Sequence, residues 1–216
     1  MAVDPRDDEA MPIVAAWLPH FARIERVAGR GGRGVSALAA QAISTGRLDL
    51  LPLRVEHAEE MAAVLSDPAL HTFIGGTPDT PQALRSRYQR ITAGSPDPAV
   101  SWLNWVIRLR DEPCLTGTVQ ATVGPSGHAT VAEVAWVVGV PWQGRGIAAE
   151  AARGVVGWLA RQPVDAVAAH IHPEHRASAA VATAAGLTPT NAWHDGELRW
   201  HLTVGHRLRR RSDGAE

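Results

Sequence analysis

The sequence contains no lysine, so every basic side chain outside histidine is an arginine. A chain without lysine cannot form a Schiff base with a carbonyl substrate, which excludes aldolase and pyridoxal-type mechanisms. Cys114 is the only cysteine, so an intrachain disulfide and a cysteine-based metal cage are excluded as well. These two absences remove whole classes of covalent and metal chemistry.

Long apolar runs and a strong net charge are also absent. No segment approaches about 18 apolar residues without a charge, so we expect no membrane-spanning helix and no membrane partner. The N-terminus opens on Asp4, Asp7, Asp8 and Glu9 rather than on basic residues, so we expect no secretory signal and a cytoplasmic location. The formal net charge of -1 gives no reason to expect a nucleic acid partner.

The length of 216 residues fits one domain of common size with an extension. We divide the chain into an N-terminal extension at 1–46, a domain at 47–204 and a basic tail at 205–216 that we expect to be disordered. Residues 11–27 have the spacing of a short helix. Residues 29–34 match G-x-G-x-x-G, but no strand precedes them, so a flexible linker is favoured over a nucleotide site.

Apolar periodicity and turn residues predict the elements of the domain. Strands are expected at 48–55, 102–110, 115–123, 130–138, 164–171 and 198–204, and helices at 56–65, 81–93, 148–160 and 177–185. A turn at 124–127 suits an antiparallel hairpin. The order of elements predicts an α+β fold, with one mixed sheet and helices on both of its faces.

The most informative segment is 134–148, where a strand leads into a two-glycine turn and then directly into a helix. The first N–H groups of a helix have no partner inside it, and the helix dipole adds partial positive charge there. Gly144 and Gly146 leave room for an anion to approach the backbone, and Arg145 can add a charged contact. The turn favours a phosphate or pyrophosphate site, although a tight turn without a ligand has the same local pattern.

Three segments resemble one known family. The letters QGRGIA at 143–148 resemble the Q/R-x-x-G-x-G/A signature of the GNAT superfamily of acetyltransferases. Residues 172–187 resemble that family's next motif, and the letters GRLDL at 46–50 resemble the opening of its branch containing the ribosomal-protein N-terminal acetyltransferases, the Rim type. The resemblance covers about 47–204, most of the chain.

The resemblance implies a mostly antiparallel sheet in which the strand at 130–138 carries a bulge and splays from the parallel strand at 164–171. Acetyl-CoA, the co-substrate, would lie in the cleft between them. Its pantetheine arm would follow Trp136, Val137 and Val138, with the N–H of Val138 donating to the thioester oxygen. The remaining implied coenzyme contacts are Gln143, Gly144, Arg145, Gly146, Ile147 and Ala148 near the pyrophosphate, and His175, which replaces the usual Asn.

Acyl transfer to nitrogen requires a neutral amine. At pH 7 a lysine-like amine is neutral in only about one molecule in 2,500, whereas an α-amine is neutral in about one in seven. Glu133 is the candidate base, because it lies beside the expected thioester and matches a glutamate of this branch; a solvated structural role is the alternative.

The candidate acid is Ser178, which matches a serine of this branch and could equally be a structural or capping residue. Many relatives use a tyrosine at the position of Ala182, but the only tyrosine here, Tyr88, lies elsewhere in the sequence. A thiol with a pKa of about 8.5 is a fair leaving group, so a dedicated acid is not obligatory.

Two further groups of residues have both structural and functional interpretations. His170, His172 and His175 have the spacing of a metal triplet, but no acidic ligand is adjacent, so we expect no metal. Trp102, Trp105 and Trp136 lie on expected strands and are more typical of a core than of a site.

The sequence therefore predicts an N-acetyltransferase that uses acetyl-CoA and acts on a primary amine, either a protein N-terminus or a small molecule. The alternatives are a non-catalytic acyl-CoA-binding regulatory module and a transferase for another donor such as succinyl-CoA. In this fold the acceptor cleft is expected to be lined by the first two helices and by loops near 70–80 and 190–197, where Asp195 and Glu197 could attract an amine or could simply be solvated. The oligomeric state is left open, with a homodimer as one option.

Overall fold

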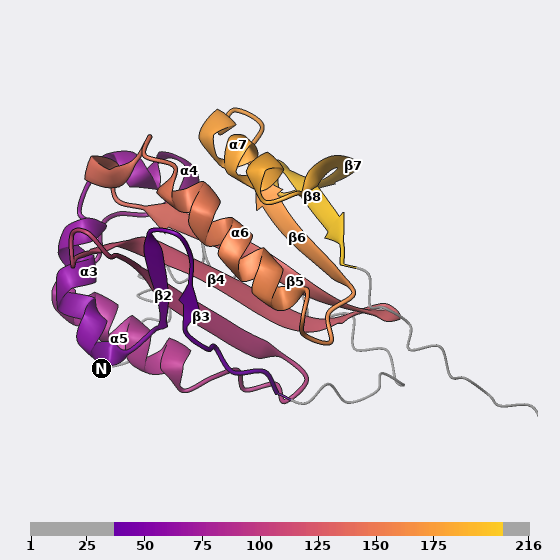
Figure 1. The fold of residues 1–216 in the computed structure, drawn as a ribbon, viewed down its shortest axis with the longest axis horizontal. Helices are drawn as coiled ribbons and strands as arrows, with labels where there is room; N and C mark the ends of the chain where they lie inside the picture. The colour runs from indigo at the N-terminus through magenta and orange to yellow at the C-terminus, as the bar shows by residue number, and fades with distance from the viewer. Residues whose placement is uncertain (1–36, 205–216) are drawn as a thin grey trace, which may run out of the picture.

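Residues 37–204 are described by the structure, a computed structural model (Figure 1). The expected helix at 11–27, the glycine-rich segment at 29–34 and the basic tail at 205–216 lie outside the described residues. Within the described part, one eight-stranded sheet has the order β1-β2-β3-β4-β5-β6-β8-β7. The pair of β5 and β6 is parallel and the other neighbours are antiparallel. The expected mixed, mostly antiparallel α+β fold is confirmed.

The elements have the following bounds. The strands are β1 Ile43–Ser44, β2 Leu48–Pro52, β3 Ser101–Leu109, β4 Leu115–Ser126, β5 Ala129–Val138, β6 Ala166–Ile171, β7 Thr188–His194 and β8 Glu197–Thr203. The helices are α3 Ala58–Val64, α4 His71–Ile74, α5 Pro81–Thr92, α6 Ile147–Leu159 and α7 Arg176–Ala184, with short 3-10 turns η2 Val55–His57, η3 Pro68–Leu70 and η4 Val140–Trp142.

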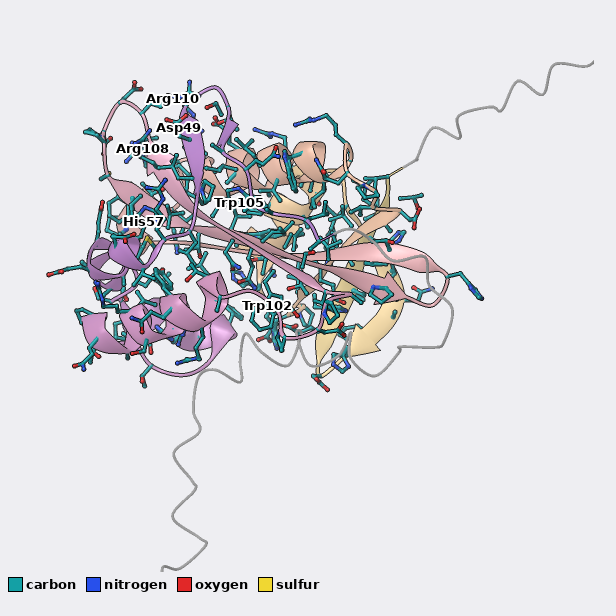
Figure 2. The ribbon with its side chains drawn as sticks, turned by 90° about the horizontal axis from the view of Figure 1, so that it is seen from below. Asp49, His57, Trp102, Trp105, Arg108 and Arg110 are labelled. Carbon is teal, nitrogen blue, oxygen red and sulfur yellow. The ribbon has the colours of Figure 1, made fainter. Side chains whose placement is uncertain are left out.

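Helices cover both faces of the sheet, because its strands bury side chains on both sides. In β3, Trp105 and Ile107 belong to the core under α6, whereas Val106 packs with α3 and α5 on the other face. Figure 1 shows α6 lying along the sheet across β4 and β5. Trp105 is fully buried and its indole N–H donates to the carbonyl of Gln41 at 2.7 Å, so this tryptophan is a core residue, whereas Trp102 points to the opposite face of the sheet (Figure 2).

The parallel pair splays as expected. Pairing of β5 with β6 runs from Val131↔Ala166 only to Glu133↔Ala168, although β5 continues to Val138 and β6 to Ile171. The expected bulge in β5 is wrong, because β4 and β5 keep an unshifted register along their whole length. The splay therefore arises where the two strands diverge after Glu133, without an extra residue in β5.

Several local predictions need correction. The hairpin between β4 and β5 turns at 127–128 rather than at 124–127, since pairing extends to Ser126↔Ala129. The elements β1, α4 and β7 were not predicted. A two-residue strand and a four-residue helix carry too little periodicity, and β7 is mostly exposed on both sides, so it lacks the alternation typical of a half-buried strand.

Residues just before 47 contact the sheet. The backbone N–H of Leu38 donates to Ser101 Oγ at 2.9 Å, and β1 pairs with β2. The division of the chain at residue 46 stays a prediction. Among residues 37–204, no helix combines the length and the apolar character needed to cross a membrane.

Candidate active site

A groove of about 670 Å³ begins at the two-glycine turn before α6. Gly144 and Gly146 both adopt left-handed conformations, with φ of 72° and 76°, and Gly146 is the N-cap of α6. The groove passes between the start of α6, where Ile147 and Ala148 line it, and α7. A residue with a side chain would be strained at either glycine, so the turn requires glycine for its shape as well as for access to the backbone.

The end of β5 directs one backbone N–H toward the splay. The N–H of Gly139 donates to Thr116 of β4 at 2.9 Å. Because hydrogen bonding alternates along an antiparallel pair, the N–H and C=O of Val138 point away from β4, toward the open side. Gln143 Nε2 donates to that C=O at 3.0 Å. Gln143 thus fixes the turn to the end of β5 and leaves the Val138 N–H facing the opening.

Arg145 lies on the same turn with its side chain already engaged. Its guanidinium lies 2.8 Å from the carboxylate of Glu112 in the β3–β4 loop, and both side chains are exposed. The backbone of Arg145 therefore lies in the glycine-rich turn, while its guanidinium is directed toward Glu112.

Arg47 and Glu150 brace the turn from the side of β2. The guanidinium of Arg47 lies 2.8 Å from Glu150 Oε2 and donates to the carbonyl of Arg145 at 3.1 Å. Glu150 Oε1 also accepts from the backbone N–H of Arg47 and from the hydroxyl of Thr45. Partial burial raises the pKa of Glu150, but these hydrogen bonds and the Arg47 charge outweigh it and hold the pKa below its usual value. These contacts therefore connect the turn to the start of β2.

A second cavity, of about 140 Å³, lies in the splay between β5 and β6. Glu133 lines it from β5, together with His170 from β6 and Ser178 from α7. The groove and this cavity share part of their wall, formed by Phe73, Trp136, Val137, His175 and Ser178. The splay thus joins the glycine-rich turn to the face of the sheet that carries Glu133.

His175 is the N-cap of α7 and stands at the position where the family motif usually has Asn. Its Nδ1 accepts a hydrogen bond from the N–H of Ser178 at 3.4 Å, which is the role of an N-cap side chain. Its ring stacks on Phe73 of α4, with centroids 4.2 Å apart. Burial, and then the nearby charge of His172, lower the pKa of His175, so the ring is neutral near neutral pH.

The remaining titratable groups near the splay come from three elements. The rings of His170 in β6 and His194 in β7 meet edge to face at 6.1 Å. Burial raises the pKa of Glu197, which lines the smaller cavity from β8. Within residues 37–204, no group of three or more His, Cys, Asp and Glu side chains is arranged to hold a metal ion.

No tyrosine is among the described residues that line the groove or the smaller cavity. Ala182, at the position where many relatives have tyrosine, is fully buried in the core under α6. Tyr88 lies in α5 within the cluster on the other face of the sheet, and burial raises its pKa well above the usual value. Ser178 is the hydroxyl that lies in the wall shared by groove and cavity.

Sequence reasoning missed several residues of this site. Phe73 lies on a segment expected to form the acceptor cleft but was not singled out, and Glu197 was considered only as a loop carboxylate that could attract an amine. Arg47 was noted only as a letter of the resemblance, and Glu150 was not considered. An acidic residue in the first turn of a helix that follows a glycine-rich turn was the available signal for Glu150.

A splayed parallel pair beside a glycine-rich helix start defines the class of coenzyme A-dependent acyltransferases. The chain belongs to the acetyltransferase (GNAT) domain family, which matches residues 47–188. It is an acetyltransferase of that family, as the sequence resemblance predicted. No functionally curated protein matches the sequence significantly.

Solved structures share the fold at low sequence identity. An acetyltransferase (GNAT family) from Bacillus anthracis is 17% identical, with a TM-score of 0.63 over 76% of this chain and 99% of the other. RimJ from Mycobacterium smegmatis, solved in complex with CoA-disulfide, is 19% identical, with a TM-score of 0.62 over 76% and 87%. An acetyl transferase from Salmonella typhimurium that modifies the N-terminal serine of a ribosomal subunit protein is 14% identical, with a TM-score of 0.60 over 76% and 100%.

Proposed function

We propose that the protein transfers the acetyl group of acetyl-CoA to a primary amine by direct attack. The observation that carries this proposal is the wall shared by the long groove and the smaller cavity. A coenzyme arm that follows the groove from the glycine-rich turn ends at Trp136 and Val137, where the cavity containing Glu133 begins. RimJ from Mycobacterium smegmatis, which shares this fold, was solved in complex with CoA-disulfide, and this supports the proposal that the groove binds a coenzyme.

The coenzyme would be held mainly by backbone groups. The N–H groups from Gly144 to Ala148 would bind the pyrophosphate at the positive end of α6. The pantetheine arm would run along β5 on the side that β6 leaves open, which brings the thioester oxygen to the N–H of Val138. His175 and Ser178 form the opposite wall.

The reaction follows from these positions. The amine nitrogen attacks the thioester carbon, and the Val138 N–H stabilises the negative charge that develops on oxygen. Glu133 accepts the proton that the nitrogen loses, directly or through water. Collapse of the intermediate breaks the C–S bond, and the thiolate leaves with a proton from the Ser178 hydroxyl or from solvent. The products are the acetylated amine and CoA.

The choice of donor follows from the charges around the groove. A succinyl group would need a cation beside the thioester. The described residues in the wall shared by the groove and the smaller cavity include no arginine, since Arg176 lines the groove alone and Arg199 lines neither space. Acetyl-CoA, whose acyl group is small and uncharged, therefore suits the site better than a succinyl donor.

The variant Glu133→Gln tests the proposal against a non-catalytic coenzyme-binding module. We expect kcat/KM for amine acetylation, followed as CoA release, to fall about 100-fold because the base is lost. The dissociation constant for acetyl-CoA should stay within about twofold, since Glu133 lies beyond the coenzyme arm. Glu59→Gln on the exposed face of α3 is the matched control.

Two results would count against this account. CoA release that is equally fast in both variants would show that Glu133 is not the base. Tight acetyl-CoA binding by the unaltered protein, without CoA release in a broad panel of primary amines, would support the regulatory module instead.

A further inference from the structure

A third cavity, of about 240 Å³, lies beyond Glu133 as seen from the coenzyme groove. Glu133 and His170 line both it and the smaller cavity, so the two spaces meet at these side chains. Val131, Trp193 and Arg199 contribute to its wall. We call this space the distal chamber. Its volume corresponds to about eight water molecules, which is enough for a group of amino-acid size.

The register places Arg199 on the same face of the sheet as Glu133. Glu133 pairs with Ala168 in β6, and His170, two residues further on, pairs with Arg199 in β8. Residues directly opposite in a sheet, and residues two apart in a strand, project to the same side. Glu133, His170 and Arg199 therefore project together, and all three line the distal chamber.

Arg199 brings a positive charge into this chamber. Its Nε is buried and has no hydrogen-bond partner among residues 37–204. A buried guanidinium N–H without a partner costs free energy that a bound oxyanion would recover. Two histidines also line the chamber: His194 lies 2.7 Å from Asp195, and the ring of His170 meets that of His194 edge to face.

We propose that the acceptor carries an anionic oxygen group, a carboxylate or a phosphate, which binds Arg199 while its amine lies at Glu133. The inference rests on the proposed function and narrows its substrate class to amino-acid-like compounds or aminoalkyl phosphates. Opposite charges in the wall of one chamber orient such a molecule with its nitrogen toward Glu133 and the splay. An uncharged alkylamine would fill the same space but leave the buried Nε of Arg199 without a partner.

Matched pairs of acceptors test this inference. The panel contains α-amino acids beside their carboxamides, and phosphoethanolamine beside ethanolamine, with CoA release as the readout. A carboxamide has the less basic and more reactive amine, so a preference for the free acid has to come from the site. We expect kcat/KM for the anionic member of at least one pair type to exceed that of its neutral partner at least tenfold, and the pair type identifies carboxylate or phosphate.

The variant Arg199→Gln should remove that preference. KM for the anionic acceptor should rise at least tenfold, while KM for the neutral partner and the dissociation constant for acetyl-CoA stay within about twofold. Arg199→Lys should restore part of the preference, because it keeps the charge. Arg153→Gln on the exposed face of α6 is the control for loss of an arginine.

The outcomes separate this inference from the proposed function. Acetylation of neutral amines as fast as of anionic ones would overturn the inference and leave the proposed function intact. A preference for a protein N-terminus without a nearby anion would do the same. Absence of CoA release with every amine, although acetyl-CoA binds, would contradict both. If Arg199→Gln does not fold, the ratio of kcat/KM for anionic and neutral acceptors, measured with the unaltered protein, still tests the inference.

Discussion

At the scale of single residues, His175 combines a structural role with a place in the wall of the site. It caps α7, stacks on Phe73 and lies where the groove meets the cavity. Asparagine, the usual family residue at this position, is also among the best N-cap residues. The replacement therefore preserves the cap and adds a ring and a titratable group.

The variant His175→Asn tests the capping role of His175. At pH 7 the variant should unfold with a free energy within about 1 kcal/mol of the unaltered protein, because the cap is kept and only ring contacts are lost. His175→Ala should lose about 1 kcal/mol more, because the cap is gone. Urea unfolding measures both, and equal stability of the two variants would contradict the capping role.

The same variant predicts a dependence on pH. The pKa of His175 is lower in the folded protein than its ordinary value, so the unfolded chain binds the proton more readily. The contribution of the neutral ring is fully present above the unfolded pKa of about 6.5 and is lost as the pH falls below it. The stability of the unaltered protein should therefore fall more steeply between about pH 7 and pH 5 than that of His175→Asn. Parallel curves would contradict the shift.

The positions of site residues were predictable where chemistry and resemblance agreed, while their catalytic roles stay predictions. Glu133 and Ser178 were expected beside the thioester, and the structure places both in the wall of one cavity. Phe73 and Arg199 were not predicted, because their roles depend on which distant segments meet. Phe73 becomes part of the wall only because α4 packs near the start of α7, and no local pattern encodes that contact.

At the scale of elements, the bridge between β2 and α6 is the feature that holds the glycine-rich turn. Arg47 and Glu150 are joined by a side-chain pair and by a backbone hydrogen bond. Arg47 also reaches the carbonyl of Arg145. The N–H groups that would bind pyrophosphate are therefore pre-positioned by a residue that itself lies outside the turn.

The variant Arg47→Ala should weaken acetyl-CoA binding about tenfold, because the turn loses a charge-assisted support worth roughly 1.5 kcal/mol. Arg108→Ala is the control, since Arg108 is similarly exposed and pairs with Asp49 in β2, whereas the described side-chain hydrogen bonds of Arg47 are with Glu150 of α6 and with the turn. Calorimetry with acetyl-CoA measures both. Equal affinities in the two variants would show that the bridge serves stability alone.

Elements were predictable where their periodicity was strong. The helix expected at 81–93 is α5, and Thr80 Oγ1 accepts from the N–H of Ala83 at its start. The positions of α6 and β5 were also close to expectation. The bulge expected in β5 was wrong, because it came from the resemblance and no residue of this strand requires it.

At the scale of the whole molecule, one charge cluster joins the three strands at one edge of the sheet, β1, β2 and β3. Figure 2 shows Asp49, Arg108 and Arg110 gathered at one end of the sheet. Asp49 lies 2.9 Å from Arg108 and 3.1 Å from Arg110, and it accepts a hydrogen bond from Ser44. The hydrogen bond from Arg108, followed by that from Ser44, lowers the pKa of Asp49 to about 2.

This cluster should contribute to resistance against acid. The contribution of ionised Asp49 is present above its unfolded pKa of about 3.9 and is lost as the pH falls toward 2. Asp49→Asn should therefore destabilise the protein by about 1 kcal/mol near neutral pH, and the difference should shrink below about pH 4. Urea unfolding near pH 7 and below about pH 4 measures the difference in stability. A difference that is constant with pH would contradict the role of the charge.

The fold as a whole could be predicted because the order of elements and the motifs agree. Strands at 102–110, 115–123 and 130–138 form the expected antiparallel centre, and the strand after the 148–160 helix forms the expected parallel pair. The proposed acceptor chamber could be predicted only in part. The segment near 190–197 was expected to line the acceptor cleft and does line the chamber, but the register of β6 and β8 that places His170 opposite Arg199 depends on contacts between distant segments.

Calorimetric titration of acetyl-CoA into three forms of the protein tests the central claim most directly. Gly144 and Gly94 both have left-handed backbones, with φ of 72° and 87°, and each has open space where a side chain would lie. Gly144 lines the groove, whereas Gly94 follows α5. Leucine at either position imposes a similar backbone strain, but only at Gly144 does it block the proposed pyrophosphate site.

The account predicts that the unaltered protein and Gly94→Leu bind acetyl-CoA with the same affinity and that Gly144→Leu binds at least tenfold more weakly. Absence of binding to the unaltered protein, or equal affinities for the two leucine variants, would contradict it.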